Sequence, residues 1–585
     1  MRDVHFGPNS VTQTTAPDGS IYVQSIYPLE SFPDRLTDSL DYWAARTPDR
    51  VFLGQRDPSG AWRTRTYAET RCAARSIAQA LLTRPVSIDR PIAILSGNDI
   101  EHALLGLGAM YAGIPYAPIS TAYSLVSSDF GKLRHIFGLL TPGLVYASDA
   151  HAYRRAIEAV LPGDAELITA ETFATLAARN GQVEDLPRSD PDTIAKILFT
   201  SGSTGVPKGV INTQRMLTSN QEIVRSILAF VAEEPPVLCD WMPWNHTFGG
   251  NHDVGFVLYN GGSLYIDEGK PTPAGIETTI RNLEDVAPTV YLNVPKGFEA
   301  LLPYLRERPG FRERFFSRLK LFYYAGAGLS QPVWDELQRH ALETCGEEIV
   351  MLTGLGSTET GPAAMFSGKD LKRAGEVGLP APGVELKLVP NPKDGKLEMR
   401  LRSPSVTPGY WREPELTRAA FDEEGFYRIG DALRFVDPAD VSKGFVFDGR
   451  LAEDFKLSSG TWVSAGPLRA RFLHHCAPWV QDVVIAGHDR DEVTALIFPS
   501  VSACGGFSTE QMQAKFQSLL EELAETSTGS SNRIARAMLM TEPPSIDKHE
   551  ATDKGSLNQG AILRHRAALV EELYSTHPSP RVIIV

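Results

Sequence analysis

A loop of small and hydroxyl-bearing residues follows directly on a strand-like segment in the first half of the chain. Residues 195–200 read AKILFT, and the sequence continues to Gly209 as SGSTGVPKG. Three glycines allow the backbone to approach a polyanion closely, and four hydroxyls with exposed N–H groups can donate to phosphate oxygens. Lys208 adds a compact positive charge. The pattern predicts a buried strand that ends in a phosphate-binding turn.

Other interpretations of this loop stay open at this point. A Walker loop reads G-x-x-x-x-G-K-[ST], whereas here Pro207 stands five residues after Gly202 and Lys208 is followed by Gly209. That departure counts against a P-loop kinase or ATPase. A plain surface turn rich in Gly and Ser is a second alternative. A protein that binds a nucleotide without catalysis is a third.

The charge balance and the cysteines exclude several classes of protein. The chain carries 57 Lys and Arg against 71 Asp and Glu, a net charge of −14, so neither nucleic acid nor an anionic membrane is an expected partner. Five scattered cysteines form no disulfide framework or zinc pattern and favour a reducing compartment. The N-terminus lacks a signal-peptide pattern, and the apolar stretch 104–119 is too short to span a bilayer. We expect a soluble cytoplasmic protein with no membrane span.

Helical and strand patterns alternate through most of the 585 residues, which predicts an α/β protein of layered sheets with two or three domains. Leu397, Met399 and Leu401 alternate with charged residues, as in a half-buried strand, and apolar residues from Ile562 to Leu573 share one helical face. Residues 526–531 indicate a loop, and strands are expected around 483–486 and 495–498. A domain boundary is expected near 448–450, where the strand-like stretch 444–447 ends.

The loop TSGSTGVPKG resembles the signature loop of the adenylate-forming superfamily, which contains acyl-CoA synthetases, luciferases and nonribosomal adenylation domains. The resemblance implies a loop that grips the β- and γ-phosphates of ATP, formed by Thr200, Ser201, Gly202, Ser203, Thr204, Gly205 and Lys208.

Further segments in the family's order extend the resemblance. Residues 353–359, TGLGSTE, are similar to the family's G-(aromatic)-G-x-T-E segment, with Leu355 in place of the aromatic residue that stacks on adenine beside Gly354. The resemblance implies that Thr358 donates to the α-phosphate and that Glu359 holds Mg²⁺. Residues 324–328, YAGAG, look like the loop that lines adenine and the acyl group. That loop contributes Ala325, Gly326 and Ala327.

The ribose and hinge segments come next in the chain. Residues 427–431, YRIGD, resemble the family's Y-R-T-G-D, in which the aspartate (here Asp431) accepts hydrogen bonds from both ribose hydroxyls. Arg450 matches an arginine that reaches the ribose at the start of the hinge. The hinge, GRLAEDFKLSSG, is one residue longer than usual, so that counting from its two ends indicates Ala452 or Glu453 as the hinge residue, with Glu453 favoured.

The resemblance implies a large N-terminal domain, residues 1–448, and a small mobile C-terminal α+β domain, residues 449–585, that swivels between two half-reactions. Lys554 is the candidate for the lysine that contacts the acyl carboxylate and α-phosphate, with Lys548 as its rival. Gly460 and Trp462 are expected to line the pantetheine tunnel. Candidate ligands for the 3′-phosphate of coenzyme A are all basic: Lys443, Lys456, Arg469 and Arg471.

Residues 244–250, WNHTFGG, align with a motif that borders the acyl site, where His246 is expected to orient the carboxylate or gate thiol entry. Polar residues follow at Asn251, His252 and Asp253, which favours a ring with hydroxyl or methoxy substituents over a bare alkyl chain. Residues 244–255, the longer hinge 449–463 and residues 551–559 together resemble the bacterial feruloyl-CoA synthase group. This resemblance implies ferulate or a related hydroxycinnamate as the acid, with ATP, Mg²⁺ and coenzyme A, in a monomer or homodimer. Another aryl or medium-chain acid, or a separate carrier as thiol acceptor, are the alternatives.

Overall fold

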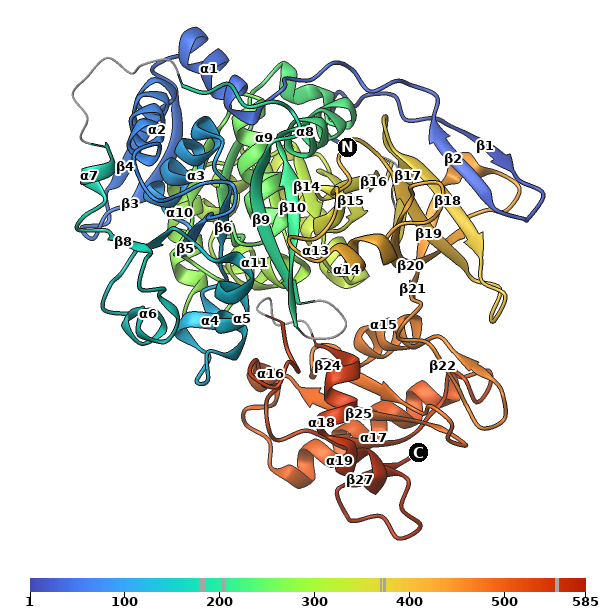
Figure 1. The fold of residues 1–585 in the computed structure, drawn as a ribbon. Coiled ribbons are helices and arrows are strands. Elements are labelled where there is room, and N and C mark those ends of the chain that lie inside the picture. The colour runs from blue at the N-terminus through green and yellow to red at the C-terminus, as the bar shows by residue number, and fades with distance from the viewer. Residues whose placement is uncertain (178–185, 202–205, 369–370, 372–374, 553–556) are drawn as a thin grey trace.

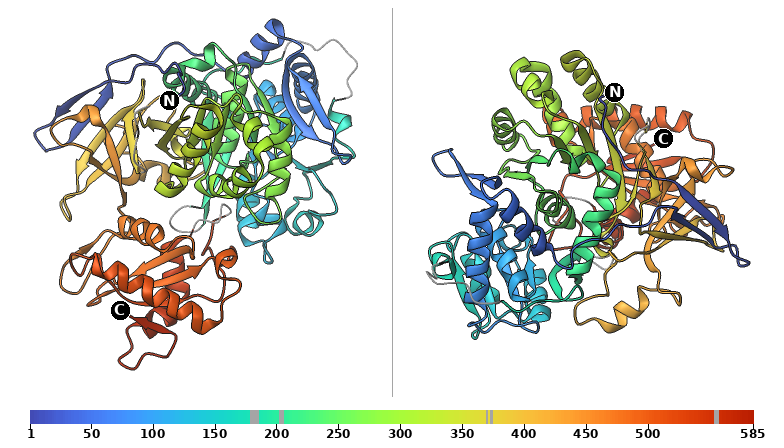
Figure 2. Two further views of the ribbon diagram at one scale, coloured as in Figure 1. Left: turned by 180° about the vertical axis from the view of Figure 1, so that it is seen from behind. Right: turned by 90° about the horizontal axis from the view of Figure 1, so that it is seen from above.

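The computed structural model describes residues 1–177, 186–201, 206–368, 371, 375–552 and 557–585. Figure 1 shows a large N-terminal body in blue to yellow and a small C-terminal body in orange and red beneath it, and the view from behind in Figure 2 shows the same division. The predicted organisation, a large α/β domain followed by a small one, is confirmed. In the described part of the chain no helix is both long and apolar enough to cross a membrane.

The largest sheet is mixed and runs from the N-terminal hairpin to the centre of the large domain. Its strands are parallel from β13 to β15 and antiparallel elsewhere. In spatial order they are β1 (Val11–Thr15), β2 (Ile21–Ser25), β18 (Glu385–Pro390), β19 (Leu397–Arg402), β20 (Tyr427–Phe435), β21 (Phe445–Arg450), β17 (Glu376–Pro380), β16 (Ala363–Phe366), β15 (Val350–Gly356), β14 (Leu321–Tyr324) and β13 (Val290–Asn293).

A second sheet carries the strand that precedes the glycine-rich loop. Its order is β10 (Pro207–Thr213), β9 (Ile194–Ser201), β6 (Tyr116–Pro118), β5 (Ile92–Leu95), β7 (Leu144–Ala147) and β8 (Glu166–Thr169). The predicted strand is confirmed in β9, whose residues 195–198 are buried, as expected for a strand covered on both faces. β10 returns antiparallel beside it. A third sheet lies next to these, with β11 (Val237–Asp240), β12 (Ser263–Ile266), β3 (Val51–Arg56) and β4 (Trp62–Thr66).

Helices cover the sheets of the large domain, and polar caps begin several of them. The Thr66 hydroxyl accepts the Glu69 N–H at the start of α2, and Asp99 accepts the His102 N–H at the start of α3, while Gly113 ends α3 in the left-handed conformation. The helices are α1 (Leu36–Arg46), α2 (Tyr67–Leu81), α3 (Ile100–Ala112), α4 (Ala122–Leu125), α5 (Gly131–Leu140), α6 (Arg154–Val160), α7 (Ala174–Ala177), α8 (Gln214–Ile227), η1 (Ala229–Ala232), η2 (Phe248–Asp253), α9 (Val254–Tyr259), α10 (Ile276–Asp285), α11 (Pro295–Glu307), α12 (Pro309–Phe316), α13 (Gln331–Cys345), η3 (Thr358–Thr360), α14 (Pro414–Ala419) and η4 (Val441–Lys443).

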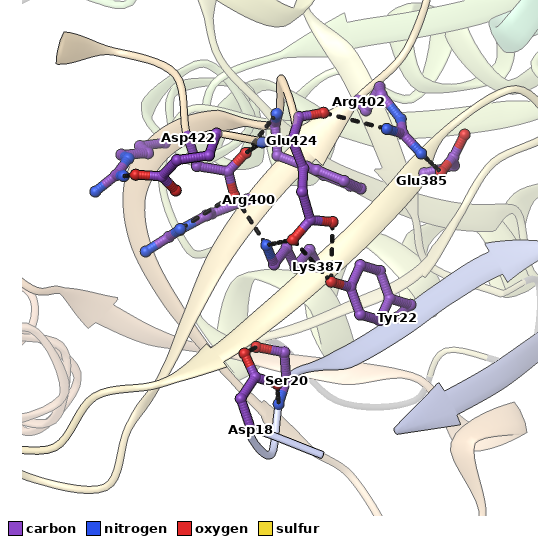
Figure 3. Close-up of polar contacts among 12 residues, drawn as sticks. Asp18, Ser20, Tyr22, Glu385, Lys387, Arg400, Arg402, Asp422 and Glu424 are labelled. Carbon is purple, nitrogen blue, oxygen red and sulfur yellow. Dashed lines mark hydrogen bonds and ion pairs between the residues drawn. The ribbon is translucent and has the colours of Figure 1, made fainter. Parts of the chain in front are cut away.

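A network of ion pairs fastens the N-terminal hairpin to the large sheet (Figure 3). The Lys387 ammonium lies 3.1 Å from Asp422 Oδ2 and 2.5 Å from Glu424 Oε1, and Tyr22 of β2 donates its hydroxyl to Glu424. Arg400 of β19 adds a second cation 3.1 Å from Asp422. Because the side chains of Lys387 and Asp422 are 7% and 0% exposed, each needs the other to offset its desolvation.

The small domain has its own core, which starts at Phe455. Its main sheet is β24 (Val480–Ala486), β25 (Val493–Pro499), β26 (Ile534–Leu539) and β27 (Val582–Ile584), with a hairpin of β22 (Phe455–Lys456) and β23 (Trp462–Val463). Its helices are α15 (Ala465–Cys476), α16 (Val501–Cys504), α17 (Thr509–Glu525), α18 (Gln559–His565) and α19 (Ala567–Leu573). The predicted strands around 397–402, 483–486 and 495–498 and the loop at 526–531 are confirmed.

Two local expectations differ from the structure. The apolar positions from Ile562 to Leu573 belong to two helices, not one, because the chain leaves the helical path at Arg566. The Arg566 guanidinium there binds the Glu550 carboxylate and the carbonyls of Glu542 and Pro543. The strand expected over 444–447 continues to Arg450, so that the proposed boundary at 448/449 lies inside β21.

Candidate active site

β9 and β10 pair as a hairpin, and the described residues that flank the predicted phosphate loop lie at its tip. Lys208 lies opposite Thr200 in the register, and Pro207 lies opposite Ser201. The Thr200 hydroxyl oxygen is buried and has no hydrogen-bond partner among the described residues, which suits a group that donates to a ligand. The predicted loop residues Gly202, Ser203, Thr204 and Gly205 lie outside the described residues.

Lys208 is held at this tip by side chains from two other segments. Its ammonium lies 2.6 Å from the Tyr410 hydroxyl and 3.1 Å from Glu359 Oε1, and the Tyr410 hydroxyl donates to the same Glu359 oxygen over 3.0 Å. The ammonium also stands 4.1 Å from the centre of the Tyr410 ring, within cation–π range. We call Lys208, Glu359 and Tyr410 the lysine clasp.

Both charged groups of the clasp remain ionised because they meet. Burial alone raises the pKa of Glu359, but the charge of Lys208 and the hydrogen bonds from Lys208 and Tyr410 outweigh it and hold that pKa below its ordinary value. Burial likewise lowers the pKa of Lys208, while Glu359 and Tyr410 together bring it above the usual value. The site thus contains one anion and one cation. A negatively charged ligand could take the place of Glu359 beside Lys208, and a cation could take the place of Lys208 beside Glu359.

Glu359 lies in a tight turn directly after β15, and the end of that strand has no room for a side chain at Gly354 or Gly356. After β15, residues Thr358–Thr360 form η3, with Thr358 and Glu359 both 6% exposed. A Cβ on Gly354 would lie 2.1 Å from the Tyr323 hydroxyl, and one on Gly356 would lie 1.7 Å from the Pro362 carbonyl oxygen. Leu355 between them is half-buried and packs against the main core. Of the predicted residues, Gly354 and Leu355 therefore lie at the end of β15, and Thr358 and Glu359 lie in the turn that directly follows it.

The loop after β14 runs beside this turn. Ala325 is half-buried, and its N–H donates to the Asn293 carbonyl of the neighbouring strand. Gly326 and Ala327 are exposed, and Gly326 has φ +84, a left-handed conformation that glycine adopts without strain. Because β14 and β15 are parallel neighbours, their carboxyl ends place both loops at one edge of the sheet.

Asp431 and Arg450 face each other across β20 and β21. They are register partners, and the Arg450 Nε lies 3.7 Å from Asp431 Oδ1. Burial raises the pKa of Asp431 to about 6, with Arg450 opposing that rise and Glu453 and Glu359 adding to it. The structure therefore brings the two predicted ribose residues together, with an aspartate that is mostly ionised at neutral pH.

The segment expected to border the acyl site is tightly wound. The His246 Nδ1 accepts the N–H of Phe248 over 3.2 Å, so its Nε2 carries the ring proton, and Nε2 is buried with no partner among the described residues. Residues Phe248–Asp253 then form η2, a π-helix, a conformation that is rare and often found at functional sites.

The hinge and the small domain touch the large domain at several points. Asp454 Oδ2 lies 2.5 Å from the Lys396 ammonium, and the Trp462 indole donates to the Lys393 carbonyl over 2.8 Å. Gly460 is exposed with φ +82. Trp462 is therefore a contact between domains in this arrangement. The hinge candidates Ala452 and Glu453 precede Asp454 in the short connection that follows β21.

The lysine segment near the C-terminus also faces the large domain. Asp547 Oδ2 accepts the N–H and the hydroxyl of Ser128, and Ala551 bridges to Leu557. Lys548 is exposed. Lys554 lies outside the described residues. Of the basic candidates for the coenzyme A phosphate, Lys443 pairs with Asp437, Arg469 pairs with Asp482, Lys456 covers the Trp462 ring, and Arg471 binds backbone carbonyls.

Sequence reasoning missed Tyr410, which completes the lysine clasp. It stands far along the chain from Lys208 and reaches it because Val210 and Tyr410 form a bridge between distant segments. The available signal was the Pro-Gly turn within Thr407–Gly409, directly before Tyr410, which marks a change of chain direction. Tyr427, quoted in the ribose segment, approaches Tyr410 with the two hydroxyls 3.4 Å apart.

Comparison with known proteins agrees with this geometry. The model of the AMP-binding enzyme family matches residues 40–411, and that of the AMP-binding enzyme C-terminal domain matches residues 454–578. The chain therefore belongs to the AMP-binding enzyme family, which confirms the adenylate-forming assignment.

The individual relatives share between a fifth and a third of their residues with this chain. Over 90% of its length the chain is 24% identical to a carboxylic acid reductase of Mycobacterium tuberculosis, of which it covers 49%. Over 51% of its length it is 30% identical to an anthranilate–CoA ligase of Pseudomonas aeruginosa, of which it covers 54%. The chain thus spans about half the length of these curated relatives. Its fold matches an anthranilate CoA ligase solved with anthranoyl-AMP, with a TM-score of 0.74, 20% identity, and coverage of 94% of this chain and 99% of the other.

Proposed function

We propose that this chain is an ATP-dependent acid–thiol ligase. It would join a hydroxycinnamic acid such as ferulate to AMP and then transfer the acyl group to coenzyme A, releasing AMP and pyrophosphate. The observation that carries the proposal is the lysine clasp, in which a lysine of the predicted phosphate loop meets a buried ionised glutamate in a chain of this family. The charge of Glu359 also acts on Asp431, the predicted ribose ligand.

In the first half-reaction a carboxylate oxygen of the acid attacks the α-phosphorus of ATP, and the bond to the bridging oxygen of pyrophosphate breaks. Both reactants are anions, so the barrier falls when charge is neutralised and the two are held in line. Lys208 would leave Glu359 for the phosphates, and Lys554 would approach the carboxylate and α-phosphate. Thr358 would donate to the α-phosphate.

Glu359 is the candidate ligand for Mg²⁺. It fits that role because its carboxylate stays ionised, and hard cations prefer such oxygens. Among the described residues no three His, Cys, Asp or Glu side chains gather as a metal site, so phosphate and water oxygens would complete the coordination. When bound, the ion would neutralise charge on the phosphate oxygens.

In the second half-reaction the sulfur of coenzyme A attacks the acyl carbonyl, and AMP leaves. Lys554 has to withdraw first, which requires the small domain to turn about the connection that contains Ala452 and Glu453. The contacts Asp454–Lys396, Trp462–Lys393 and Asp547–Ser128 would break or change in that turn. Gly460 and Trp462 would then border the pantetheine arm.

The alternatives are a ligase for another aryl or medium-chain acid, and an adenylating enzyme that loads a separate carrier. The similarity to a carboxylic acid reductase across most of this chain supports the carrier-loading alternative.

The test is release of AMP from Mg-ATP with ferulate, coumarate, benzoate or octanoate, each with and without coenzyme A. Turnover that depends on coenzyme A and is fastest with ferulate supports the full proposal. Fastest turnover with octanoate or benzoate retains the reaction and refutes the substrate. AMP release unaffected by coenzyme A favours the carrier-loading alternative. ADP in place of AMP refutes the reaction altogether.

The Lys554→Ala variant tests the role of the lysine segment. It should nearly abolish adenylation yet leave thioester formation from supplied acyl-AMP largely intact. Equal loss of both half-reactions would contradict this role, and an unchanged adenylation rate would transfer it to Lys548.

A further inference from the structure

A buried polar relay lies directly behind the segment that carries His246. His252 and Asp253, the last two residues of η2, are 1% and 0% exposed, and Asp240 at the end of β11 is 4% exposed. Asp240 Oδ1 accepts the Met242 N–H over 3.1 Å, and after burial the charge of Asp253 is the next cause that raises the pKa of Asp240. His252 Nδ1 lies 2.9 Å from Asp253 Oδ1. We call Asp240, Asp253 and His252 the carboxyl–histidine relay.

The backbone around the relay is packed too closely to shift. A Cβ on Gly249 would lie 2.3 Å from the Met242 carbonyl oxygen, and one on Gly250 would lie 2.1 Å from the Trp244 carbonyl oxygen. The buried ammonium of Lys196 donates to the Gly250 carbonyl over 2.8 Å. Since both glycines and Lys196 fix the π-helical turn, the His252 ring has a defined position.

The chemistry of the relay assigns the protons. Burial raises the pKa of Asp240 and of Asp253, and each carboxyl disfavours the charge of the other, so at most one of the two is ionised. Burial lowers the pKa of His252 to about 4, so its ring is neutral at pH 7. We assign the ring proton to Nδ1, which donates to Asp253 Oδ1 over 2.9 Å. Nε2 is then a hydrogen-bond acceptor.

That acceptor is unpartnered within the described part of the chain. The His252 ring is stacked with Phe256 and with Tyr323, at centroid distances of 5.9 and 5.4 Å and interplanar angles of 19° and 15°. Phe248 meets the ring edge-on at 5.6 Å. Nε2 itself is buried without a hydrogen-bond partner. An unpaired buried acceptor is costly, so a group of this kind in a native fold needs an explanation.

The neighbours of His252 place it at the predicted acyl site. Phe248 donates its N–H to His246. Tyr323 lies in β14, directly before the loop that contains Ala325, and its hydroxyl lies against Gly354 in the turn that leads to Glu359. His252 therefore packs against the His246 segment and against Tyr323, which leads to the Ala325 loop and contacts the end of β15 before Glu359.

We propose that His252 Nε2 accepts a hydrogen bond from a hydroxyl or amino group of the acyl substrate, with Asp253 and Asp240 holding the ring in the accepting form. The inference rests on the proposed function and deepens it. On this proposal the site requires an acid with a hydroxyl or amino group that can donate to His252 Nε2. An acid that offers an acceptor or an apolar group at the same place would leave Nε2 buried and unpaired, which a polar site rejects strongly.

The test measures kcat/KM for AMP release with cinnamate, with 2-, 3- and 4-hydroxycinnamate, and with the methyl ether of whichever hydroxycinnamate reacts best. We expect that hydroxycinnamate to exceed cinnamate and its own methyl ether by roughly tenfold or more, the usual effect of one buried hydrogen bond. Equal values for all of these acids would leave the proposed function standing and would refute the role of His252. No AMP release with any of them would refute the proposed function, and the inference with it.

Two variants separate the acceptor from the packing. In His252→Asn the side-chain amide can still donate to Asp253 but Nε2 is lost, so the preference for the hydroxyl should fall to nearly one. In His252→Gln the amide reaches the place of Nε2, so part of the preference should return. His340→Asn is the matched control, because His340 is buried in α13 and its ion-pair partners Glu336 and Glu343 lie on its own helix.

The hydroxyl preference is a ratio measured on one protein, so a loss of stability that lowers all rates equally does not imitate the result. A His252→Asn variant that keeps the wild-type ratio would refute the inference. Should that variant fail to fold by circular dichroism, the comparison of acids on the wild type decides the question by itself.

Discussion

Removing the charge of Lys208 should reverse the contribution of Glu359 to the pH dependence of stability: the large domain should lose stability, not gain it, as this carboxyl ionises. Lys208→Met keeps most of the aliphatic stem but removes the ammonium that lies 3.1 Å from Glu359 Oε1. The Glu359 side chain is 8% exposed and would keep the hydrogen bond from Tyr410 but lose its counter-charge. Breaking a buried pair from one side costs about 3–5 kcal/mol, and we expect a loss in that range near neutral pH.

The sign of the pH effect follows from the pKa of Glu359. In the wild type that pKa is held below the ordinary value of 4.5, so its ionised form stabilises the fold above that value, and the stabilisation is lost as the pH falls through the lowered pKa. In Lys208→Met burial acts without the counter-charge and moves the pKa above the ordinary value. The protonated acid is then the form that the fold favours. The penalty should be small at about pH 4 and grow toward pH 7.

The measurement is urea unfolding at about pH 4.5 and pH 7.5, followed by tryptophan fluorescence. Lys443→Met is the control, because Lys443 pairs with Asp437 on the surface and its loss should change little at either pH. Adding Glu359→Gln to Lys208→Met removes both charges and should restore most of the stability. A loss that is the same at both pH values, or a double variant no more stable than Lys208→Met, would refute the reasoning.

Three further predictions concern other parts of the chain. Lys387→Met leaves the fully buried Asp422 with less compensation and should lower the free energy of unfolding by about 3 kcal/mol, measured by urea unfolding. Burial raises the pKa of Asp431 to about 6, so KM for ATP should rise below that pH in the wild type but not in Asp431→Asn. The stability of the wild type should instead increase as this carboxyl is protonated between about pH 6 and 4. Lys396→Ala removes the partner of Asp454 at the domain junction and should speed limited proteolysis there, and an unchanged cleavage rate would contradict the proposed contact.

Local composition made the nucleotide segments predictable. Glycine-rich turns with hydroxyls and a lysine after a buried strand have few structural uses, so residues 200–209 indicated a phosphate site without any knowledge of the fold. The same holds for Gly356 at the end of β15, where a side chain would clash with the nearby Pro362 carbonyl. Such positions identify themselves because the constraint lies within a few residues.

Periodicity was less reliable where a distant side chain intervened. The helix expected from Ile562 to Leu573 is broken because the guanidinium of Arg566 satisfies carbonyls and a carboxylate from residues 542–550. An apolar repeat reports which face is buried, and both short helices do bury that face, but it does not report whether the backbone is continuous.

The sequence by itself determined the family of the chain. It also predicted the candidate residues in order: a loop for phosphates, an acid for a cation and an aspartate for ribose. Only the tertiary structure decided which of them meet. The lysine clasp depends on the bridge between Val210 and Tyr410, and the carboxyl–histidine relay depends on β11 ending beside a π-helical turn. Contacts between residues far apart in sequence follow from sheet register and packing. Charge and pKa depend in turn on burial, which no short stretch of sequence specifies.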